Sequence, residues 1–155
     1  MLPLVTVGIP VKNGFAKRYI DENFIYTEDD IDLEKALNSI LKQSYKNIEI
    51  IISNNGSSDE TNMYLEKIAK SDNRIRVFNQ NPEILPLANF QFLLKNSIGK
   101  YFKWNAADDI ISEDFIEKNV EFLENNLDYS CASSKFWFQN EKEKIYSHNL
   151  NQDSL

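Results

Sequence analysis

The sequence has one cysteine, Cys131, and one histidine, His148. A single cysteine excludes an internal disulfide, and so few thiol and imidazole groups argue against a zinc cluster or a Ser-His or Cys-His catalytic pair. The chain also has only four glycines and contains neither G-x-G-x-x-G nor G-x-x-x-x-G-K-[ST], which leaves little room for a phosphate-cradling loop. We therefore expect any chemistry to use carboxylates.

Basic residues are outnumbered, since 17 Lys and Arg stand against 24 Asp and Glu, for a net charge of −7. That sign disfavours nucleic acid as the main partner. Residues 1–11 carry no basic leader before a short apolar run, and no run is long enough to span a bilayer. We expect a cytoplasmic protein, with membrane association through further segments or partners left open.

Apolar runs alternate with amphipathic stretches along the 155 residues, a length that suits one globular domain. Buried strands are predicted over 4–9, 47–53 and 101–104, and a strand with an alternating pattern over 74–79. Pro10 is expected to end the first strand because it has no N–H. Helices are predicted over 31–43, 57–68, 87–97 and 112–127, followed by a fifth strand over 129–138. Residues 15–30 show no clean period and predict a loop with one helical turn. This order predicts an α/β fold with a doubly wound, mostly parallel sheet and helices on both faces.

Capping signals precede two of the predicted helices. Ser57 and Glu60 have the spacing of a capping box, so Ser57, Ser58 and Asp59 are predicted to be structural caps. Ser112 is predicted to cap the last helix. Burial is predicted for Phe90, Leu93 and Leu94 in one helix, and for Phe115, Ile116, Val120, Leu123 and Leu127 in the last.

Polar side chains follow three of the predicted strands: Lys12 and Asn13, Asn54 and Asn55, and Asp108 and Asp109. Because the carboxyl ends of parallel strands meet at one edge of a sheet, we expect these side chains to face one crevice. Adjacent carboxylates suit a divalent cation held against a phosphate-bearing ligand, and side-chain amides suit a base or a ribose. The alternatives from these residues alone are ordinary turns and, for the acids, the first turn of a helix.

Three blocks of the sequence resemble family 2 of the glycosyltransferases, which have the GT-A fold. VTVGIPVKNG is similar to the opening strand and loop of that family, SILKQSYKNIEIIISNNGSSDET to its second unit, and GKYFKWNAADD to its metal-binding strand. The resemblance covers residues 4–138. It implies a nucleotide-sugar-binding GT-A domain over 1–138, followed by a polar tail over 139–155 that starts a missing acceptor-binding portion.

The resemblance also implies roles for single residues. The donor nucleotide would be held by Pro10, Val11, Asn13, Asn54, Asn55 and Asp108, and Mn²⁺ or Mg²⁺ would be bound by Asp109 and Asp108. The implied function is inverting transfer of a sugar from a nucleotide diphosphate sugar to a hydroxyl of a glycan or lipid-linked acceptor, in bacterial polysaccharide synthesis. We expect the donor to be a UDP-sugar. The alternative is a non-catalytic nucleotide-sugar-binding module, or a subunit completed by a partner chain.

The sequence departs from the family's pattern in three ways. Typical members have a uracil-recognising aspartate where Asn54 or Asn55 stands, which leaves the base undetermined. Ala106 and Ala107 fill positions often held by an acid or a serine, so the metal has fewer ligands. The carboxylate that deprotonates the acceptor has no match, so the catalytic general base is expected outside this chain, and the apolar edge that would be left exposed predicts a homo-oligomer.

Overall fold

The computed structural model describes residues 2–15, 32–134, 137–139 and 144–146. The chain divides into two compact units, Met1–Glu113 and Asp114–Leu155. The loop predicted over 15–30, except for its first residue, and most of the predicted tail lie outside the described residues. In the described part of the chain, no helix has the length and apolar character needed to cross a membrane.

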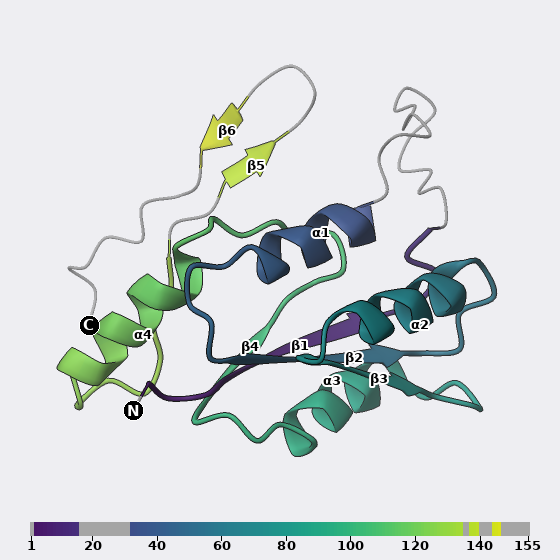
Figure 1. Cartoon of the computed structure of the whole chain (residues 1–155), viewed down its shortest axis with the longest axis horizontal. Helices are drawn as coiled ribbons and strands as arrows, with labels where there is room; N and C mark the ends of the chain where they lie inside the picture. The colour runs from purple at the N-terminus through teal and green to yellow at the C-terminus, as the bar shows by residue number, and fades with distance from the viewer. Residues whose placement is uncertain (1, 16–31, 135–136, 140–143, 147–155) are drawn as a thin grey trace. The chain divides into compact units, whose positions relative to one another are not determined.

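Four parallel strands form the sheet of the first unit (Figure 1). They are β1 (Val5–Val11), β2 (Ile48–Asn54), β3 (Ile75–Asn79) and β4 (Tyr101–Trp104), in the spatial order β3-β2-β1-β4. Every residue of β2, and every residue of β1 except Pro10, is buried. This burial is typical of parallel strands covered on both faces, and it confirms the predicted α/β fold with a mostly parallel sheet.

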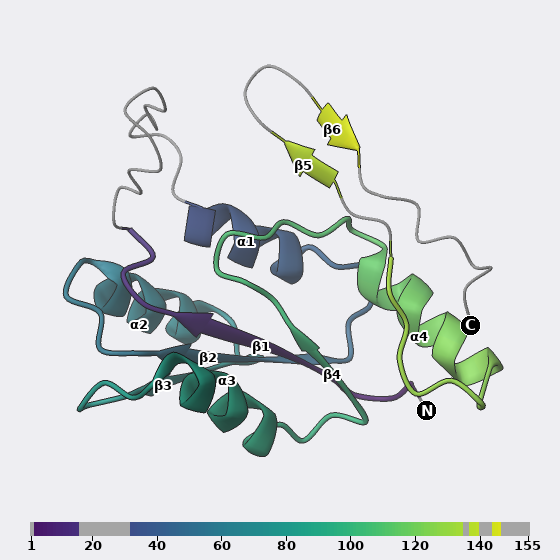
Figure 2. The ribbon, with the colours of Figure 1, turned by 180° about the vertical axis from the view of Figure 1, so that it is seen from behind.

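Helices cover both faces of this sheet. α1 (Asp32–Leu41) and α2 (Thr61–Ser71) lie on one face, and α3 (Pro86–Lys95) lies on the other, as the two opposite views show (Figures 1 and 2). The side chains of Leu33, Ala36, Leu37 and Ile40, which recur at helical spacing in α1, are fully buried. α3 packs against β1 and β2.

Pro10 does not end β1, which continues to Val11, so that prediction is wrong. The Asn105 N–H donates to the Gly8 carbonyl, which shows that Gly8 directs its backbone groups toward β4. Pro10, two residues further along, faces the same side, where the pairing with β4 has already ended at Gly8. Proline is tolerated there because no ladder hydrogen bond is lost.

α3 buries a different set of residues from the predicted one. Leu93 is buried as predicted, but Phe90 and Leu94 are exposed, and the second buried residue is Asn89. Asn89 fits because Ser53 Oγ donates to its Oδ1 (2.5 Å) and its amide donates to the Ser53 carbonyl (3.2 Å). Hydrophobic periodicity missed this residue because a paired asparagine in a core looks like a surface residue in the sequence.

The second unit contains α4 (Phe115–Asn125) and an antiparallel pair, β5 (Trp137–Gln139) and β6 (Lys144–Tyr146). The fifth strand predicted over 129–138 is wrong over 129–134, where Tyr129 is exposed and the small side chains that follow it offer little apolar surface to bury. α4 buries Ile116, Val120 and Leu123 as predicted, whereas Leu127 lies beyond its end and is exposed. Ser112 is not its cap, since the N-cap residue is Asp114 and no side chain caps it.

A buried carboxylate joins the strands near their amino ends. Glu49 of β2 accepts hydrogen bonds from Thr6 Oγ1 (2.5 Å) and from the Ile98 N–H (2.8 Å), and it lies 3.3 Å from the Arg76 guanidinium. Thr6 Oγ1 accepts in turn from the Gly99 N–H (2.9 Å). A Cβ at Gly99 would lie 2.6 Å from the Thr6 nitrogen, so the close approach needs glycine. These contacts fix the turn that leads from α3 into β4.

We predict that Glu49→Ala lowers the free energy of unfolding by about 1–3 kcal/mol, because the buried donors of Thr6 and Ile98 lose their acceptor. Urea denaturation measures this loss. Glu66→Ala is the control, since Glu66 is an exposed acid that accepts a surface hydrogen bond from Asn62. A loss at Glu49 no larger than that at Glu66 would contradict the structural role of Glu49.

Candidate functional site

The strand order reverses between β1 and β4, because the chain builds β2 and β3 on one side of β1 and then places β4 on the other. Ligands of doubly wound sheets bind at such a point, beyond the carboxyl ends of the strands. Here β1 leads into Lys12 and Asn13, and β4 leads into residues 105–109. The structure therefore brings the end of β1 and the acid pair to the same edge, as predicted.

Asp108 and Asp109 lie on a turn directly after β4. The Asp109 N–H donates to the Ala106 carbonyl (3.2 Å), and the Asp109 side chain is exposed, whereas that of Asp108 is half-buried. The acids do not occupy the first turn of a helix, since the next helix begins at Phe115. Their position leaves two readings, an ordinary turn or a ligand site.

Asn105 holds this turn in place. Its side chain is fully buried, and its amide donates to the carbonyls of Ala106 and Asp109, both at 2.9 Å. Its Oδ1 accepts from Lys103 Nζ (2.8 Å), and its N–H donates to the Gly8 carbonyl of β1 (2.9 Å). The sequence analysis missed Asn105, although an asparagine directly after an apolar strand was a signal. One buried residue thus links β1, through its backbone N–H, with Lys103 of β4 and the acid-bearing turn, through its side chain.

Lys103 brings a positive charge close to the acids. Burial lowers the pKa of the Lys103 ammonium, and the nearby Asp109 carboxylate opposes this shift because it favours the charged form. Lys103 Nζ also donates to the Trp104 carbonyl (2.9 Å). The charge of Asp109 therefore favours the protonated form of this lysine.

The chain that follows the acids is tied to the end of α1. The Ile111 N–H donates to Ser39 Oγ (3.2 Å), and Gln43 Nε2 donates to the Ser112 carbonyl (2.6 Å). Gln43 is fully buried and lies in the block SILKQSYKNIEIIISNNGSSDET quoted above. With Asn105 on one side and Gln43 on the other, the turn that carries Asp108 and Asp109 is anchored at both ends.

The oxygen ligands that this turn offers suit a hard divalent cation such as Mg²⁺. Among the described residues, no three Asp, Glu, His or Cys side chains converge on a point. Mg²⁺ and similar hard cations often bind through one or two carboxylates and take their remaining oxygens from water and substrate phosphates. Asp108 and Asp109 therefore suit a metal that a bound diphosphate completes, and they do not form an all-protein cage.

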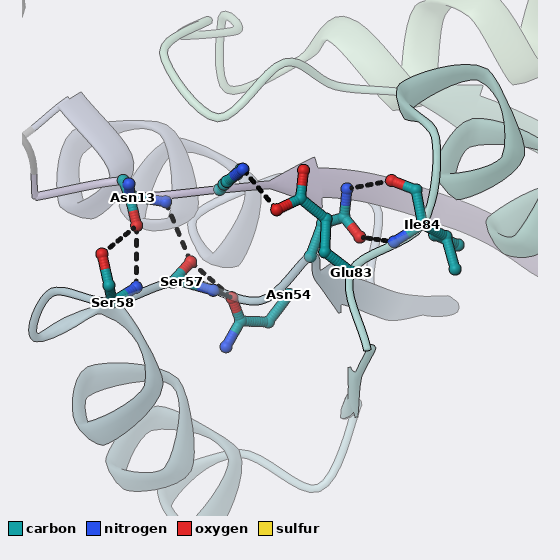
Figure 3. Close-up of polar contacts among 8 residues, drawn as sticks. Asn13, Asn54, Ser57, Ser58, Glu83 and Ile84 are labelled. Carbon is teal, nitrogen blue, oxygen red and sulfur yellow. Dashed lines mark hydrogen bonds and ion pairs between the residues drawn. The ribbon is translucent and has the colours of Figure 1, made fainter. Parts of the chain in front are cut away.

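Asn13 joins the end of β1 to the loop that follows β2 (Figure 3). Its backbone is left-handed, with φ 52°, a conformation that asparagine tolerates better than most residues. The Asn13 N–H donates to Ser57 Oγ (2.9 Å), and its Oδ1 accepts from the Ser58 N–H (2.9 Å). Asn13 is therefore a structural residue of this edge, whatever it contacts in a ligand.

The predicted caps of α2 have different partners. Glu60 is the N-cap residue of α2 and its side chain makes no capping hydrogen bond, so the predicted capping box is wrong. Ser57 Oγ accepts from the Asn13 N–H, so this serine fastens the end of β1 to the loop. Asp59 does act at the helix start, because its Oδ1 accepts from the Thr61 N–H (3.0 Å) and its Oδ2 from the Phe15 N–H (2.9 Å).

Asn54 and Asn55 are buried, with 3% and 4% of their surfaces exposed. The Asn54 amide donates to Asn79 Oδ1 (3.0 Å), and its Oδ1 accepts from Ser57 Oγ (2.5 Å). Asn55 makes two bonds to one residue, donating to the Ile84 carbonyl (2.8 Å) and accepting from the Ile84 N–H (2.9 Å). Both amide hydrogens and both oxygen lone pairs of Asn54 are engaged, so a nucleoside contact from it would have to replace a bond. The bonds of Asn55 use one hydrogen and one lone pair, so its burial is what limits such a contact. The nucleoside contact of either amide stays a prediction.

Comparison with known sequences finds one family and several relatives. The profile described as glycosyl transferase family 2 matches residues 25–154. A glycosyltransferase of Haemophilus influenzae is 36% identical over 141 residues, which cover 91% of this chain and 39% of that protein. Glycosyltransferase GlyA of Streptococcus pneumoniae is 32% identical over 152 residues, which cover 97% of this chain and 19% of that protein. The chain thus spans less than half the length of these relatives.

Solved structures share the fold at low sequence identity. The mannosyltransferase PcManGT from Pyrobaculum calidifontis, in complex with GDP-Man and Mn²⁺, has a TM-score of 0.64 at 18% identity and covers 79% of this chain and 33% of its own. S. aureus TarS in complex with UDP-GlcNAc has a TM-score of 0.63 at 19% identity, with 79% and 32% covered. These likenesses confirm the predicted GT-A fold.

We predict that Asn105→Ala lowers the free energy of unfolding by about 1–3 kcal/mol, because buried groups of Lys103, Ala106 and Asp109 lose a partner. Asn105→Asp keeps the shape but cannot donate to the two carbonyls, so it should be destabilising as well. Urea denaturation measures both variants. Gln91→Ala, which removes an exposed amide on α3, is the control; equal stability of all three variants would contradict the anchoring role of Asn105.

Proposed function

The chain belongs to glycosyltransferase family 2, and we propose that its first unit binds the nucleotide diphosphate sugar that donates the sugar. The observation that carries the proposal is the placement of Asp108 and Asp109, on a turn anchored at both ends, at the point where the strand order reverses. The ligands of the two solved structures, a GDP-sugar with Mn²⁺ and a UDP-sugar, support this substrate class. For this chain we propose a UDP-sugar as the first donor to test.

In this proposal Asp108 and Asp109 hold Mn²⁺ or Mg²⁺ against the two phosphates of the donor. The cation, when bound, neutralises charge on the diphosphate as the bond between the sugar and oxygen breaks. In the same proposal, the backbone of Pro10, Val11 and Asn13, at the end of β1 and just beyond it, contacts the nucleoside. The rest of the proposal for the whole protein is inverting transfer to a hydroxyl of a glycan or lipid-linked acceptor, with a general base supplied by a residue other than those described for this site.

A non-catalytic donor-binding module is the second candidate. It is favoured by the sparse metal site, since Ala106 precedes the acids and no third acid, histidine or cysteine joins them among the described residues. Slow Mn²⁺-dependent hydrolysis of the donor distinguishes the two candidates, because a binding module would protect the sugar linkage and a transferase site would polarise it.

We predict that Asp109→Ala abolishes Mn²⁺-dependent binding of UDP and leaves the unfolding midpoint unchanged, because this exposed side chain supports no core. Asp108→Ala should weaken binding less. Isothermal titration with and without Mn²⁺ gives the affinities, and thermal denaturation without ligand gives the stabilities.

Asp128→Ala serves as the matched control, since Asp128 is an exposed acid in the second unit. If wild type and Asp109→Ala bind UDP with the same dependence on Mn²⁺, the acid pair is an ordinary turn and the proposed metal site is wrong.

A further inference from the structure

An ion pair lies at the same edge of the sheet as the proposed donor site. Lys12, which follows β1, places its Nζ 2.6 Å from Oε2 of Glu83, which lies between β3 and α3. Because β2 lies between β1 and β3, the pair passes over the carboxyl end of β2. The two side chains are 46% and 50% exposed, so a ligand can reach both of them. Pairs this exposed add little to stability, which leaves room for another role.

The position of Glu83 is set by buried neighbours. Asn55 bonds to both the N–H and the carbonyl of the next residue, Ile84. Gly56, with φ +67°, packs against Glu83, and a Cβ at Gly56 would lie 3.3 Å from Glu83 Cβ. The Asn-Asn-Gly sequence after β2 is thus built around the loop that carries Glu83. The backbone that carries this exposed carboxylate is therefore held in place by the chain itself, which lowers the cost of ordering it around a ligand.

The buried amides at this edge have partners within the chain, as described above for Asn54 and Asn55. Side chains that reach solvent are therefore better placed to recognise a base. Lys12 and Glu83 offer a hydrogen-bond donor and an acceptor side by side. From the turn after β4 to the loop after β3 is three strand spacings, about 14 Å at about 4.8 Å each. A nucleotide with its phosphates at Asp108 and Asp109 can extend along this row with its base toward the pair.

We propose that Lys12 and Glu83 select the base of the donor, with Glu83 accepting a hydrogen bond from a ring N–H and Lys12 donating to the carbonyl oxygen beside it. Uracil and guanine present a ring N–H next to a carbonyl, whereas adenine and cytosine lack that N–H in their normal tautomers. The ligand class is therefore a uridine or guanosine diphosphate sugar. This inference rests on the proposed donor binding.

Isothermal titration of UDP, GDP, ADP, CDP and pyrophosphate, each with Mn²⁺, tests the proposal. Wild type should bind UDP or GDP about tenfold more tightly than ADP and CDP, as expected when about 1.4 kcal/mol of hydrogen bonding to charged groups is lost. Glu83→Ala and Lys12→Ala should each lose that preference while their affinity for pyrophosphate stays unchanged. Two exposed residues on helices provide charge-matched controls, Glu121→Ala and Lys67→Ala.

The exchange of the two charges, Lys12→Glu with Glu83→Lys, separates base reading from a structural role. The double variant keeps an ion pair between the loops but reverses donor and acceptor, so the base preference should not return. A return of the base preference in the double variant would overturn the proposal, and so would an unchanged preference in Glu83→Ala. It would also be overturned if Lys12→Ala lost as much affinity for pyrophosphate as for UDP or GDP, because Lys12 would then be a phosphate ligand. If wild type binds none of the five ligands, the proposed donor binding itself fails and the base selection fails with it.

Discussion

Parallel pairing of β1 with both β2 and β4 is the constraint on which the rest of the first unit depends. It puts the carboxyl ends of all the strands at one edge, so each strand delivers its following loop to the same place. The apolar residues of β1 and β2 favour this arrangement because the side chains on both faces of these strands are buried, so neither face can be turned to solvent. The site is a consequence of this burial: residues that are far apart in sequence become neighbours.

The loops at that edge are shaped by side chains rather than by regular backbone pairing. Asn13 bonds to the loop after β2, Asn55 bonds to the loop after β3, and Asn105 bonds within the turn after β4. Asparagine suits this work because its amide can donate and accept at once, and because it tolerates turn conformations. The loops after β1, β2 and β3 are therefore held by one another, so a change in Asn13 or Asn55 should reach the neighbouring loop, whereas Asn105 fixes its own turn.

The sequence predicted the sheet and the position of the acid pair after β4 because both depend on local patterns. Apolar runs identify β1 and β2 in the sequence, and Asp108 and Asp109 follow shortly after a run of aromatic residues. The roles of the amides could not be predicted, since whether Asn54 faces a ligand or Asn79 depends on which loops fold beside it. The same limit explains Asn89, whose burial is made possible by a serine on another strand.

The central claim is that Asp108 and Asp109 form a metal site that a nucleoside diphosphate completes. The most direct measurement is a crystal structure of the protein grown with UDP and Mn²⁺, with the metal located by its anomalous scattering. The claim predicts one Mn²⁺ bound by at least one of the two carboxylates and by oxygens of both phosphates. A nucleotide bound at this edge with no metal at either carboxylate, or Mn²⁺ bound elsewhere on the chain, would contradict it.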